Sequence, residues 1–402
     1  MKYIVFLGDG MADLPNDELG GKTPLECAKK PNIDALAKKG TMGLVKTVDD
    51  RLSPGSDVAN LSVLGYDPFI YYTGRSPLEA LSIGAPLFDG DVTFRANLVT
   101  LSEEENYADK TMVDYSSDEI TTEESTILIN FLKEKLIYEK IAFYPGISYR
   151  HLMIWSGGST CVSLTPPHDI SKRVVGDYLP KGDGDSTILE IMKKSYELLK
   201  DHPVNLGRIK RGLNPANSLW IWGEGTKPQL DNFKEKFGLT GTMISAVDLL
   251  KGIGKGTGMN VVEVAGATGN VHTNFKGKAD AAIEAFKSGS DFVYIHVEAA
   301  DECGHRHETE NKVRSIELID EKIVGPVTEY LKSTGEPFSA LVTPDHPTPL
   351  SLMTHTREPI PFVIYRSYDE KDGGATYTEK NAKDTGLFIA KGFELMTKFL
   401  EK

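Results

Sequence analysis

Three short apolar runs, each followed closely by acidic residues, constrain the fold of this chain most strongly. The runs span residues 3–7, 292–297 and 339–343, and the acidic residues that follow them are Asp9, Glu298, Asp301 and Asp345. Continuous β-rich runs of this length are typical of strands buried on both faces. Helical patterns between them, at residues 25–39, 278–287 and 312–332, predict an α/β fold with a largely parallel sheet flanked by helices. Ligands of such sheets bind beyond the carboxyl ends of the strands, where these acidic side chains are expected.

The middle of the chain shows a different pattern. Strand-like segments at residues 91–101, 150–156 and 160–164 are mixed with helical segments at 122–135 and 187–200 and with Gly/Pro-rich joints. Strand–helix alternation resumes from residue 219 onward. We therefore predict a core formed by residues 1–68 and 216–402, into which a smaller α+β domain, residues 69–215, is inserted.

Composition excludes several classes of function. The formal net charge of −13 argues against nucleic acid or an anionic membrane as a partner, because both attract basic surfaces. No apolar stretch approaches the roughly 20 residues of a membrane span, and the N-terminal run is too short for a signal peptide. The three cysteines are far apart and form no C-x-x-C pair, so no disulfide framework or thiolate zinc site is expected. We expect a cytoplasmic protein that binds a small anion through a local group of cations.

Asp301 and His305 are candidate ligands of a metal ion. In a helix, their i, i+4 spacing places a carboxylate and an imidazole on one face, roughly 5–6 Å apart at Cβ. The same spacing also suits a surface ion pair, so the motif alone leaves both interpretations open.

Asp345 and His346, followed by His355, form a richer candidate cluster. Prolines surround them, and a Pro-rich loop at a strand end can direct adjacent ligands into two neighbouring sites. A Pro-rich turn with capping polar groups is the alternative. With Asp9, Asp301 and His305 they make six ligands without thiolate, enough for two divalent ions once substrate and water are added. This ligand set suggests Mn²⁺, Mg²⁺ or catalytic Zn²⁺.

Ser56 is the candidate nucleophile. It follows Gly55 and begins an amphipathic stretch, which predicts a position at a helix N-terminus, where free N–H groups and the helix dipole favour an alkoxide and a phosphate. A serine that only caps the helix would look the same. A serine hydroxyl needs activation by a base or a metal, and activation by metal fits the ligand set better.

Two other motif classes do not account for the chemistry. The chain has no G-x-S-x-G nucleophile elbow, so a hydrolase triad is not the simpler interpretation. Residues 252–258 are glycine-rich but match neither G-x-x-x-x-G-K-[ST] nor G-x-G-x-x-G. We predict a turn there rather than a nucleotide loop.

Taken in order, the motifs resemble those of the archaeal-type cofactor-independent phosphoglycerate mutases, which belong to the alkaline phosphatase superfamily. The segments that carry the resemblance are residues 8–13 (GDGMAD), 21–25 (GKTPL), 54–60 (PGSDVAN), 64–68 (LGYDP), 301–305 (DECGH) and 344–347 (PDHP). They cover nearly the whole chain. The resemblance implies an alkaline-phosphatase-like core with an inserted domain and a dinuclear metal site.

Carried over position by position, the resemblance implies roles for individual residues. One metal would be held by Asp9, Ser56, Asp345 and His346, and the other by Asp301, His305 and His355. Ser56 would take the phosphoryl group from 3-phosphoglycerate and return it to the other hydroxyl, without 2,3-bisphosphoglycerate, as a step of glycolysis. The inserted domain would close over the small phosphorylated substrate and exclude water.

The substrate's carboxylate and phosphate must be met by cations on this acidic protein. Candidates are the adjacent pairs Arg150–His151 and His168–Asp169 in the insert and Lys251 in the core. Residues 73–80 (TGRSPLEA) depart from the archaeal pattern, which has a bulkier G-R-G-F-F-E-A type segment, and resemble a bacterial subgroup proposed to phosphorylate homoserine. A phosphoglycerate mutase, a transferase acting on homoserine or a similar alcohol, and a metal-binding protein without turnover are the three hypotheses.

Overall fold

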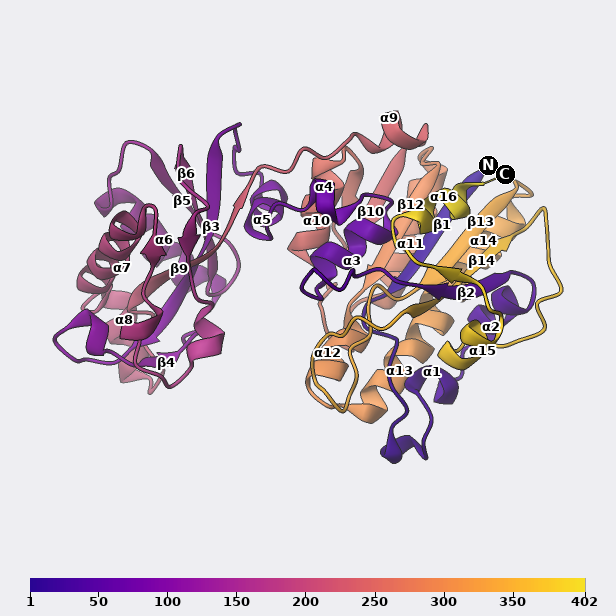
Figure 1. Ribbon diagram of the computed structural model, residues 1–402, viewed down its shortest axis with the longest axis horizontal. Helices are drawn as coiled ribbons and strands as arrows, with labels where there is room; N and C mark the ends of the chain where they lie inside the picture. Colours follow the sequence, from indigo (N-terminus) through magenta and orange to yellow (C-terminus); the bar gives the residue numbers. More distant parts are fainter. Residues whose placement is uncertain (402) are drawn as a thin grey trace. The chain divides into compact units, whose positions relative to one another are not determined.

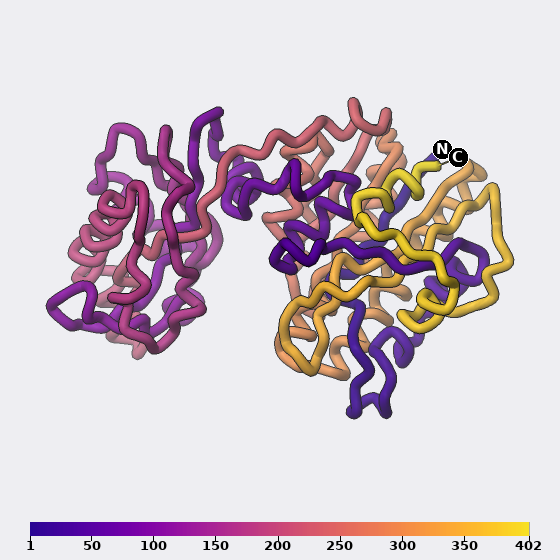
Figure 2. Tube along the Cα trace, in the orientation of Figure 1, coloured from indigo at the N-terminus to yellow at the C-terminus, as the bar shows by residue number. Residues whose placement is uncertain are grey.

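The computed structural model describes residues 1–401 and divides into two compact units. Unit 1 is formed by Met1–Tyr72 together with the chain from Gln229 onward, and unit 2 is Thr73–Pro228. The chain leaves unit 1 once and returns to it once, as the tube in Figure 2 shows. The first and the last described segments of the chain lie close together in unit 1, where the ring of Tyr3 packs edge-on against that of Phe399 at 5.7 Å.

Both unit boundaries differ from the expected positions, after residues 68 and 215. The second one moves because β9 (Ser218–Thr226) pairs antiparallel with β3 (Asp91–Leu101) and so lies in unit 2. The first one moves because α4 (Pro68–Tyr71) packs in unit 1 against α3 (Ser56–Val63) and the residues that follow it, with the rings of Tyr66 and Tyr71 at 5.2 Å. Strand pairing sets one boundary and helix packing the other, and the composition of a segment reveals neither contact.

Unit 1 contains one eight-stranded sheet in the order β11-β10-β12-β1-β13-β14-β2-β15 (Figure 1). Pairing is parallel from β11 to β13, and only β14 runs antiparallel to its two neighbours. The expected α/β fold with a largely parallel sheet is therefore confirmed. The strands are β1 (Lys2–Gly8), β2 (Thr41–Val45), β10 (Gly241–Ile244), β11 (Asn260–Val262), β12 (Phe292–Val297), β13 (Phe338–Thr343), β14 (Ile360–Arg366) and β15 (Phe388–Ile389).

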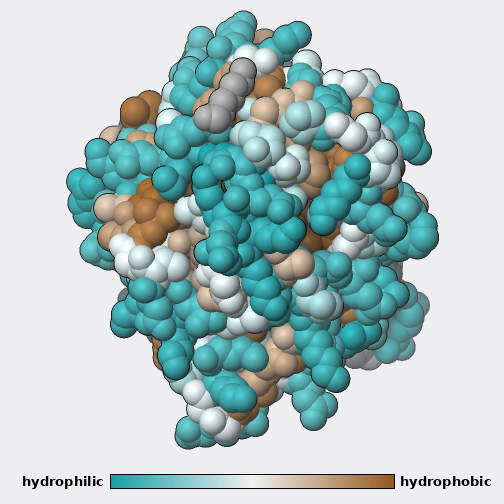
Figure 3. Space-filling view, turned by 90° about the vertical axis from the view of Figure 1, so that its right-hand side faces the viewer, coloured by the Kyte–Doolittle hydropathy of each residue, from teal (hydrophilic) through white to brown (hydrophobic). Residues whose placement is uncertain are grey.

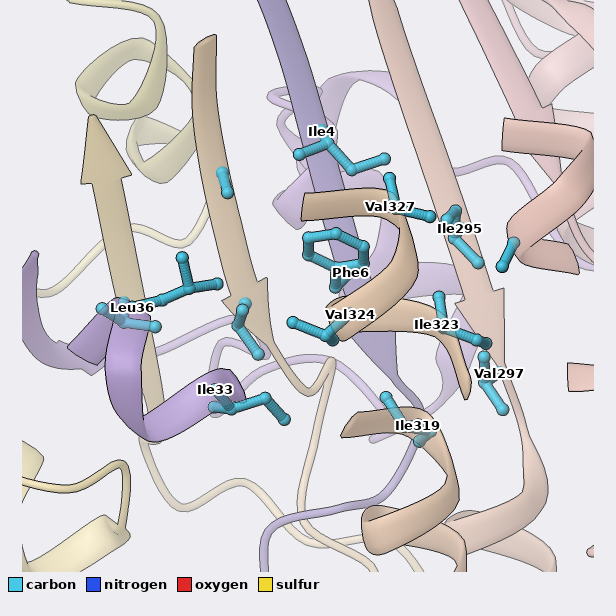
Figure 4. Close-up of a cluster of buried hydrophobic side chains, with 14 of the residues drawn as sticks. Ile4, Phe6, Ile33, Leu36, Ile295, Val297, Ile319, Ile323, Val324 and Val327 are labelled. Atoms are coloured by element: carbon cyan, nitrogen blue, oxygen red, sulfur yellow. The ribbon is translucent and has the colours of Figure 1, made fainter. Parts of the chain in front are cut away.

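Helices cover both faces of this sheet. On one face, Ile4 and Phe6 of β1 pack against Ile33 of α2 and against Ile323 and Val327 of the α13–α14 region (Figure 4). On the other face lie α3, α10 and α16 (Figure 1). The helices of unit 1 are α1 (Pro24–Cys27), α2 (Pro31–Lys38), α3, α4, α9 (Phe233–Phe237), α10 (Asp248–Gly256), α11 (Phe275–Lys287), α12 (Ala299–His305), α13 (Thr309–Ile319), α14 (Gly325–Ser333), α15 (Glu379–Asp384) and α16 (Glu394–Leu400), with a 3₁₀ turn η1 (Asp17–Leu19).

Three sequence-predicted elements of unit 1 differ in detail. The helix expected at residues 25–39 is split into α1 and α2, because Pro31 restricts Lys30 and starts a new helix. The helix expected at 312–332 contains a π-helical turn, η5 (Asp320–Val324), between α13 and α14. The turn predicted at residues 252–258 is wrong, since α10 extends to Gly256 and buries Leu249, Leu250 and Ile253.

Unit 2 is a smaller α+β unit around a five-stranded antiparallel sheet. Helices α6 and α7 pack on one face of β3 and β6, while α5 covers part of the other face beside Leu152 and Ile154. Its strands are β3, β4 (Met112–Asp114), β5 (Ile141–Tyr144), β6 (Arg150–Ser156) and β9, with a separate pair β7 (Val162–Ser163) and β8 (Lys181–Gly182). Its helices are α5 (Ser76–Ile83), α6 (Thr122–Lys135), α7 (Asp185–Leu199) and α8 (Pro203–Lys210), with 3₁₀ turns η2 (Tyr107–Asp109), η3 (Pro167–Ile170) and η4 (Gly176–Tyr178).

On the face seen in Figure 3, hydrophilic residues predominate and apolar residues form small separate patches. Among residues 1–401, no helix has both the length and the apolar composition needed to cross a bilayer.

Candidate active site

The carboxyl ends of two adjacent parallel strands bring Asp9, Asp345 and His346 together. Asp9 directly follows β1, and Asp345 and His346 follow β13, its hydrogen-bonded neighbour. His346 Nε2 lies 3.5 Å from Asp9 Oδ1 and 3.4 Å from Asp345 Oδ2, and all three side chains are buried. The strand-end acidic residues therefore meet at one edge of the sheet, as the sequence predicted.

Ser56 is the first residue of α3, with its hydroxyl directed at this cluster. Its Oγ lies 3.1 Å from His346 Nε2 and 3.5 Å from Asp9 Oδ2. Asn60, one turn further along α3, donates 2.8 Å hydrogen bonds both to the Ser56 carbonyl and to Asp345 Oδ2. Asn60 thus fixes the start of the helix relative to the strand end, a role that sequence reasoning missed.

A second group forms beside the first around Asp301 on α12. His355 Nε2 lies 3.2 Å from Asp301 Oδ1, and His305 Nε2 lies 3.4 Å from Asp301 Oδ2. The Nε2 atoms of His305 and His355 are 2.8 Å apart, so both rings present a ligand atom to the same point. Asp301 and His305 are therefore not an isolated surface ion pair. His355, from a loop distant in the sequence, contacts both of them.

Hydrogen bonding and burial act in opposite directions on the charges of this second group. Burial alone would raise the pKa of Asp301, but hydrogen bonds from His305 and His355 outweigh it and hold that pKa well below its usual range. The hydrogen bond with Asp301 raises the pKa of His305 to about 9. Asp301 is therefore a carboxylate, as a metal ligand must be.

The first group has an excess of negative charge that a cation would neutralise. Burial, followed by the charges of Asp345, Asp301 and Glu298, raises the pKa of Asp9 well above its usual range. Asp9 Oδ1 is buried and has no hydrogen-bond donor among residues 1–401. Three sets of ligand atoms lie within 4.8 Å of one another: Asp301, His346 and His355; Asp9, Asp345 and His346; and Asp9, Glu298 and Asp301. Oxygen and imidazole donors of this kind fit Mn²⁺, Mg²⁺ or Zn²⁺.

His296 is a site residue that the sequence analysis missed. It lies at the end of β12, fully buried, with Nε2 at 2.9 Å from Asp9 Oδ2 and Nδ1 at 3.1 Å from Ser245 Oγ. Burial lowers its pKa to about 3, so the ring is neutral and can donate one hydrogen bond to Asp9. Its signal in the sequence was a polar residue within an otherwise apolar strand, since a buried polar group requires a partner.

Behind the site lies a buried polar network centred on Asp13. Lys312 Nζ lies 2.7 Å from Asp13 Oδ2, and both side chains are almost completely buried. The Asp13 N–H donates a 3.1 Å hydrogen bond to Glu379 Oε1, and the Thr23 hydroxyl donates one of 2.7 Å to Oε2 of the same carboxyl group. The network ties the loop after β1 to α13 and α15.

Glu379 is expected to make the stability of the chain fall as the pH rises. Burial raises its pKa from the ordinary value of 4.5 to about 7. The unfolded chain therefore loses this proton at lower pH than the folded chain, and the stabilisation present below pH 4.5 is lost as the pH rises toward 7. Because the side chain keeps partial exposure, we expect a loss on the order of 2 kcal/mol.

The measurement is urea unfolding at pH 5 and pH 8 of the wild type and Glu379→Gln, in which the amide mimics the protonated acid. We subtract the free energy of unfolding of wild type from that of Glu379→Gln at each pH. This difference should be about 2 kcal/mol more positive at pH 8 than at pH 5. Glu310→Gln, an exposed glutamate on α13, should show no such change. An equal difference at both pH values would contradict this assignment.

The structure separates the four candidate substrate residues of unit 2. Arg150 begins β6 and is exposed, whereas His151 points to the opposite, helix-covered face and is buried, with Nδ1 accepting a 3.0 Å hydrogen bond from the Gly146 N–H. His168 and Asp169 lie in η3 and are exposed, with His168 Nε2 at 3.6 Å from Asp169 Oδ1. Adjacent strand residues alternate between faces, so Arg150 and His151 do not act together.

Sequence reasoning missed a cluster of arginines in unit 2. Arg75 and Arg95 both contact Glu79, each at 3.1 Å, and the guanidinium of Arg95 lies 4.5 Å from the centre of the Trp222 ring. The ring of His168 packs against the same Trp222 at 5.4 Å. The charge of Arg150 acts on both Glu79 and Arg95, so three arginines share one carboxylate and leave an excess of positive charge.

Lys251, the candidate cation of the core, lies on α10 in unit 1. Its Nζ is 3.6 Å from Asp248 Oδ1 and 3.3 Å from Glu263 Oε1. These two carboxylates already balance its charge. The structure does not place it among the ligand groups at the strand ends.

The chain is similar to known proteins over its whole length. Residues 37–205 match the family model described as 2,3-bisphosphoglycerate-independent phosphoglycerate mutase. A protein of that name from Methanosarcina barkeri is 49% identical, with 98% of each chain covered, and one from Methanothrix thermoacetophila is 46% identical over the same shares. A solved structure of the cofactor-independent phosphoglycerate mutase from Thermoplasma acidophilum is 26% identical, with a TM-score of 0.66, 100% of this chain covered and 99% of that one. A solved protein from Pyrococcus horikoshii, 30% identical, covers 99% and 96% with a TM-score of 0.82.

These similarities confirm the resemblance inferred from the ordered motifs. Relatives of nearly half-identical sequence extend over both units, and the motif residues converge at one edge of the unit 1 sheet. This chain belongs to the 2,3-bisphosphoglycerate-independent phosphoglycerate mutase family.

Proposed function

We propose that the chain interconverts 3-phosphoglycerate and 2-phosphoglycerate through a phosphoserine formed at Ser56, without 2,3-bisphosphoglycerate. The observation that carries this proposal is the position of Ser56 Oγ, at 3.1 Å from His346 Nε2 and 3.5 Å from Asp9 Oδ2, at the first turn of α3. Relatives in this family bear the name of that activity. A hydroxyl in such a position can attack phosphorus, and the N-terminus of a helix favours the phosphate's negative charge.

The same proposal includes two divalent cations. Asp9, Ser56, Asp345 and His346 would hold one, and Asp301, His305 and His355 the other. The fit is supported by the unpaired Oδ1 of buried Asp9 and by the 2.8 Å approach of two imidazole Nε2 atoms. When bound, the cations would neutralise charge on the phosphoryl group and lower the pKa of the serine hydroxyl. Mn²⁺, Mg²⁺ and Zn²⁺ all suit this donor set.

The chain's own residues define the steps of the transfer. Ser56 Oγ loses its proton and forms a bond to phosphorus, while the bond between phosphorus and the glycerate oxygen breaks and that oxygen gains a proton. The other hydroxyl of glycerate then loses its proton and forms a bond to phosphorus, while the bond between phosphorus and Ser56 Oγ breaks and that oxygen regains a proton. Asn60 holds the first turn of α3 against Asp345 in both steps, so the serine keeps its direction.

Unit 2 would supply the cations that bind the substrate's carboxylate. Arg150 and Arg75 are the exposed members of a positively charged cluster on an otherwise acidic chain, and Arg95 is its buried member. The planar guanidinium of arginine can bind a carboxylate through two hydrogen bonds. His151 is not part of this proposal, because it is buried on the other face of β6.

Arg150→Ala is expected to raise KM for 3-phosphoglycerate by about 10- to 100-fold, the effect of losing hydrogen bonds to a charged partner. The turnover number should change much less, since Ser56 is untouched. Steady-state kinetics with Arg150→Lys, which keeps the charge, and Arg173→Ala, an exposed arginine of unit 2 that hydrogen-bonds Tyr178, provide the controls. If Arg150→Ala has the same KM as Arg173→Ala, Arg150 does not bind the substrate.

The proposed activity is tested with purified protein, 3-phosphoglycerate and Mn²⁺, with 2,3-bisphosphoglycerate excluded and 2-phosphoglycerate detected by an enolase-coupled assay. We expect conversion in both directions. A parallel reaction containing homoserine and a phosphoryl donor tests the transferase hypothesis that residues 73–80 raised. Phosphohomoserine without any interconversion of the phosphoglycerates would overturn the mutase proposal.

A further inference from the structure

Thr348 contacts one residue of each proposed ligand group. It lies in the loop after β13, is fully buried, and its Oγ1 is 2.5 Å from Asp301 Oδ1 and 3.3 Å from His346 Nδ1. A hydroxyl has one proton to donate and can also accept, so Thr348 donates to the carboxylate and accepts from the imidazole N–H. The His346 proton then lies on Nδ1, and Nε2, the atom facing Ser56, keeps its lone pair.

Two glycines leave room for this side chain. A Cβ atom on Gly10 would lie 2.7 Å from Thr348 Oγ1, and one on Gly304 would lie 2.8 Å from Thr348 Cγ2 and 2.5 Å from its carbonyl oxygen. Such distances are shorter than real Cβ contacts. Both segments that flank Thr348 therefore have glycine at the point of closest approach.

The backbone around Thr348 is held from behind by the Asp13–Lys312 pair. Lys312 Nζ donates a 2.7 Å hydrogen bond to the Thr348 carbonyl, and the Thr348 N–H donates one of 3.2 Å to the Ala12 carbonyl. The Leu350 N–H donates to Asp13 Oδ2 at 3.2 Å. With its main chain bound on both sides, the threonine presents its hydroxyl in one direction.

We propose that Thr348 is a positioning residue that couples the two proposed metal centres by orienting Asp301 and His346 at the same time. This inference rests on the proposed function, because it concerns the ligands of those cations. Partners that orient metal ligands typically affect metal affinity or activity by about 10- to 100-fold. One hydroxyl shared between the two groups would make the ordering of one site depend on the other.

The test compares Thr348→Val, which keeps the shape and removes the hydroxyl, with Thr348→Ser, which keeps the hydroxyl and removes the methyl group. Mn²⁺ binding to chelator-treated, full-length protein is measured by calorimetry. We expect Thr348→Val to bind Mn²⁺ about 10- to 100-fold more weakly, and Thr348→Ser to bind it nearly as wild type does. At low Mn²⁺ concentration Thr348→Val should be less active than wild type, and its activity should return as the Mn²⁺ concentration is raised. At saturating Mn²⁺, its KM for 3-phosphoglycerate should be little changed.

The outcomes distinguish a failure of the role of Thr348 from a failure of the proposed metal sites. Wild-type Mn²⁺ affinity in Thr348→Val would overturn the role of Thr348 and leave the metal sites intact. Equally weak binding by Thr348→Ser and Thr348→Val would also overturn it, since methyl packing would then be the cause. If wild-type protein itself binds no Mn²⁺, the proposed metal sites fail and the inference about Thr348 fails with them. Melting of the metal-free variants checks that both are folded.

Discussion

Replacing Ser56 with alanine is expected to reduce turnover by on the order of 10⁴-fold or more, because the substitution removes the oxygen that accepts the phosphoryl group in the proposed mechanism. The substitution removes one oxygen at the start of α3. The hydrogen bonds from Asn60 to the residue 56 carbonyl and to Asp345 remain. The variant should therefore fold, bind substrate and melt close to the wild-type temperature.

Ser53→Ala is the matched control. Ser53 is an exposed serine in the same loop, three residues earlier, and should leave turnover unchanged. Rates are measured with 3-phosphoglycerate at saturating concentration and Mn²⁺ present. A Ser56→Ala enzyme that keeps more than a few per cent of wild-type turnover would show that phosphoryl transfer does not proceed through this serine.

Removing divalent cations is expected to abolish activity and to lower the melting temperature. Without a cation, the carboxylates of Asp9, Asp301 and Asp345 repel one another in a buried space. Burial first, and this repulsion second, raise the pKa of Asp9. A ligand present at 100 times its dissociation constant stabilises the folded state by about 2.7 kcal/mol per site, so a shift of several degrees should be measurable. Added Mn²⁺ should restore both activity and melting temperature, whereas chelator already saturated with Mn²⁺ should have no effect.

The variant Asp9→Asn tests whether repulsion between these carboxylates destabilises the metal-free protein. The amide removes one repelling charge, so the metal-free variant should melt above the metal-free wild type. Added Mn²⁺ should then stabilise it much less than it stabilises wild type. Full activity after exhaustive chelation, or equal stabilisation of both proteins by Mn²⁺, would contradict the metal sites.

Much of unit 1 could be predicted because its signals are local. β12 spans the predicted residues 292–297, and β1 and β13 are each only one or two residues longer than predicted. Continuous apolar runs of this length, rich in β-branched and aromatic residues and bounded by Gly and Pro, mostly form buried strands. Because parallel strands end at one edge, the meeting of Asp9 and Asp345 followed from the fold.

Other features depended on tertiary contacts that no local pattern contains. Residues 218–226 form a strand that sequence reasoning assigned to the core, but pairing with β3 places it in unit 2. The glycines of α10 suggested a turn, yet the buried face of Leu249, Leu250 and Ile253 stabilises a helix there. In both places, packing outweighed the local preference of the segment.

The site was predicted unevenly for the same reason. The metal-ligand candidates belong to motifs that can be recognised in the sequence, whereas His296, Thr348 and Asn60 are polar residues whose roles appear only through their neighbours. The arginine cluster was missed because Arg75, on the N-terminal side of α5, and Arg95, on β3, are brought together through Glu79. His151 was included for its position near a strand end, but strand alternation turns it inward.

The most direct test of the proposed mechanism is mass spectrometry of the protein after brief incubation with 3-phosphoglycerate and Mn²⁺ and rapid acid quenching. The mechanism predicts one added phosphate, located on Ser56 by peptide fragmentation and missing from Ser56→Ala. Active enzyme that never carries phosphate on Ser56, or that carries it on another residue, would contradict it.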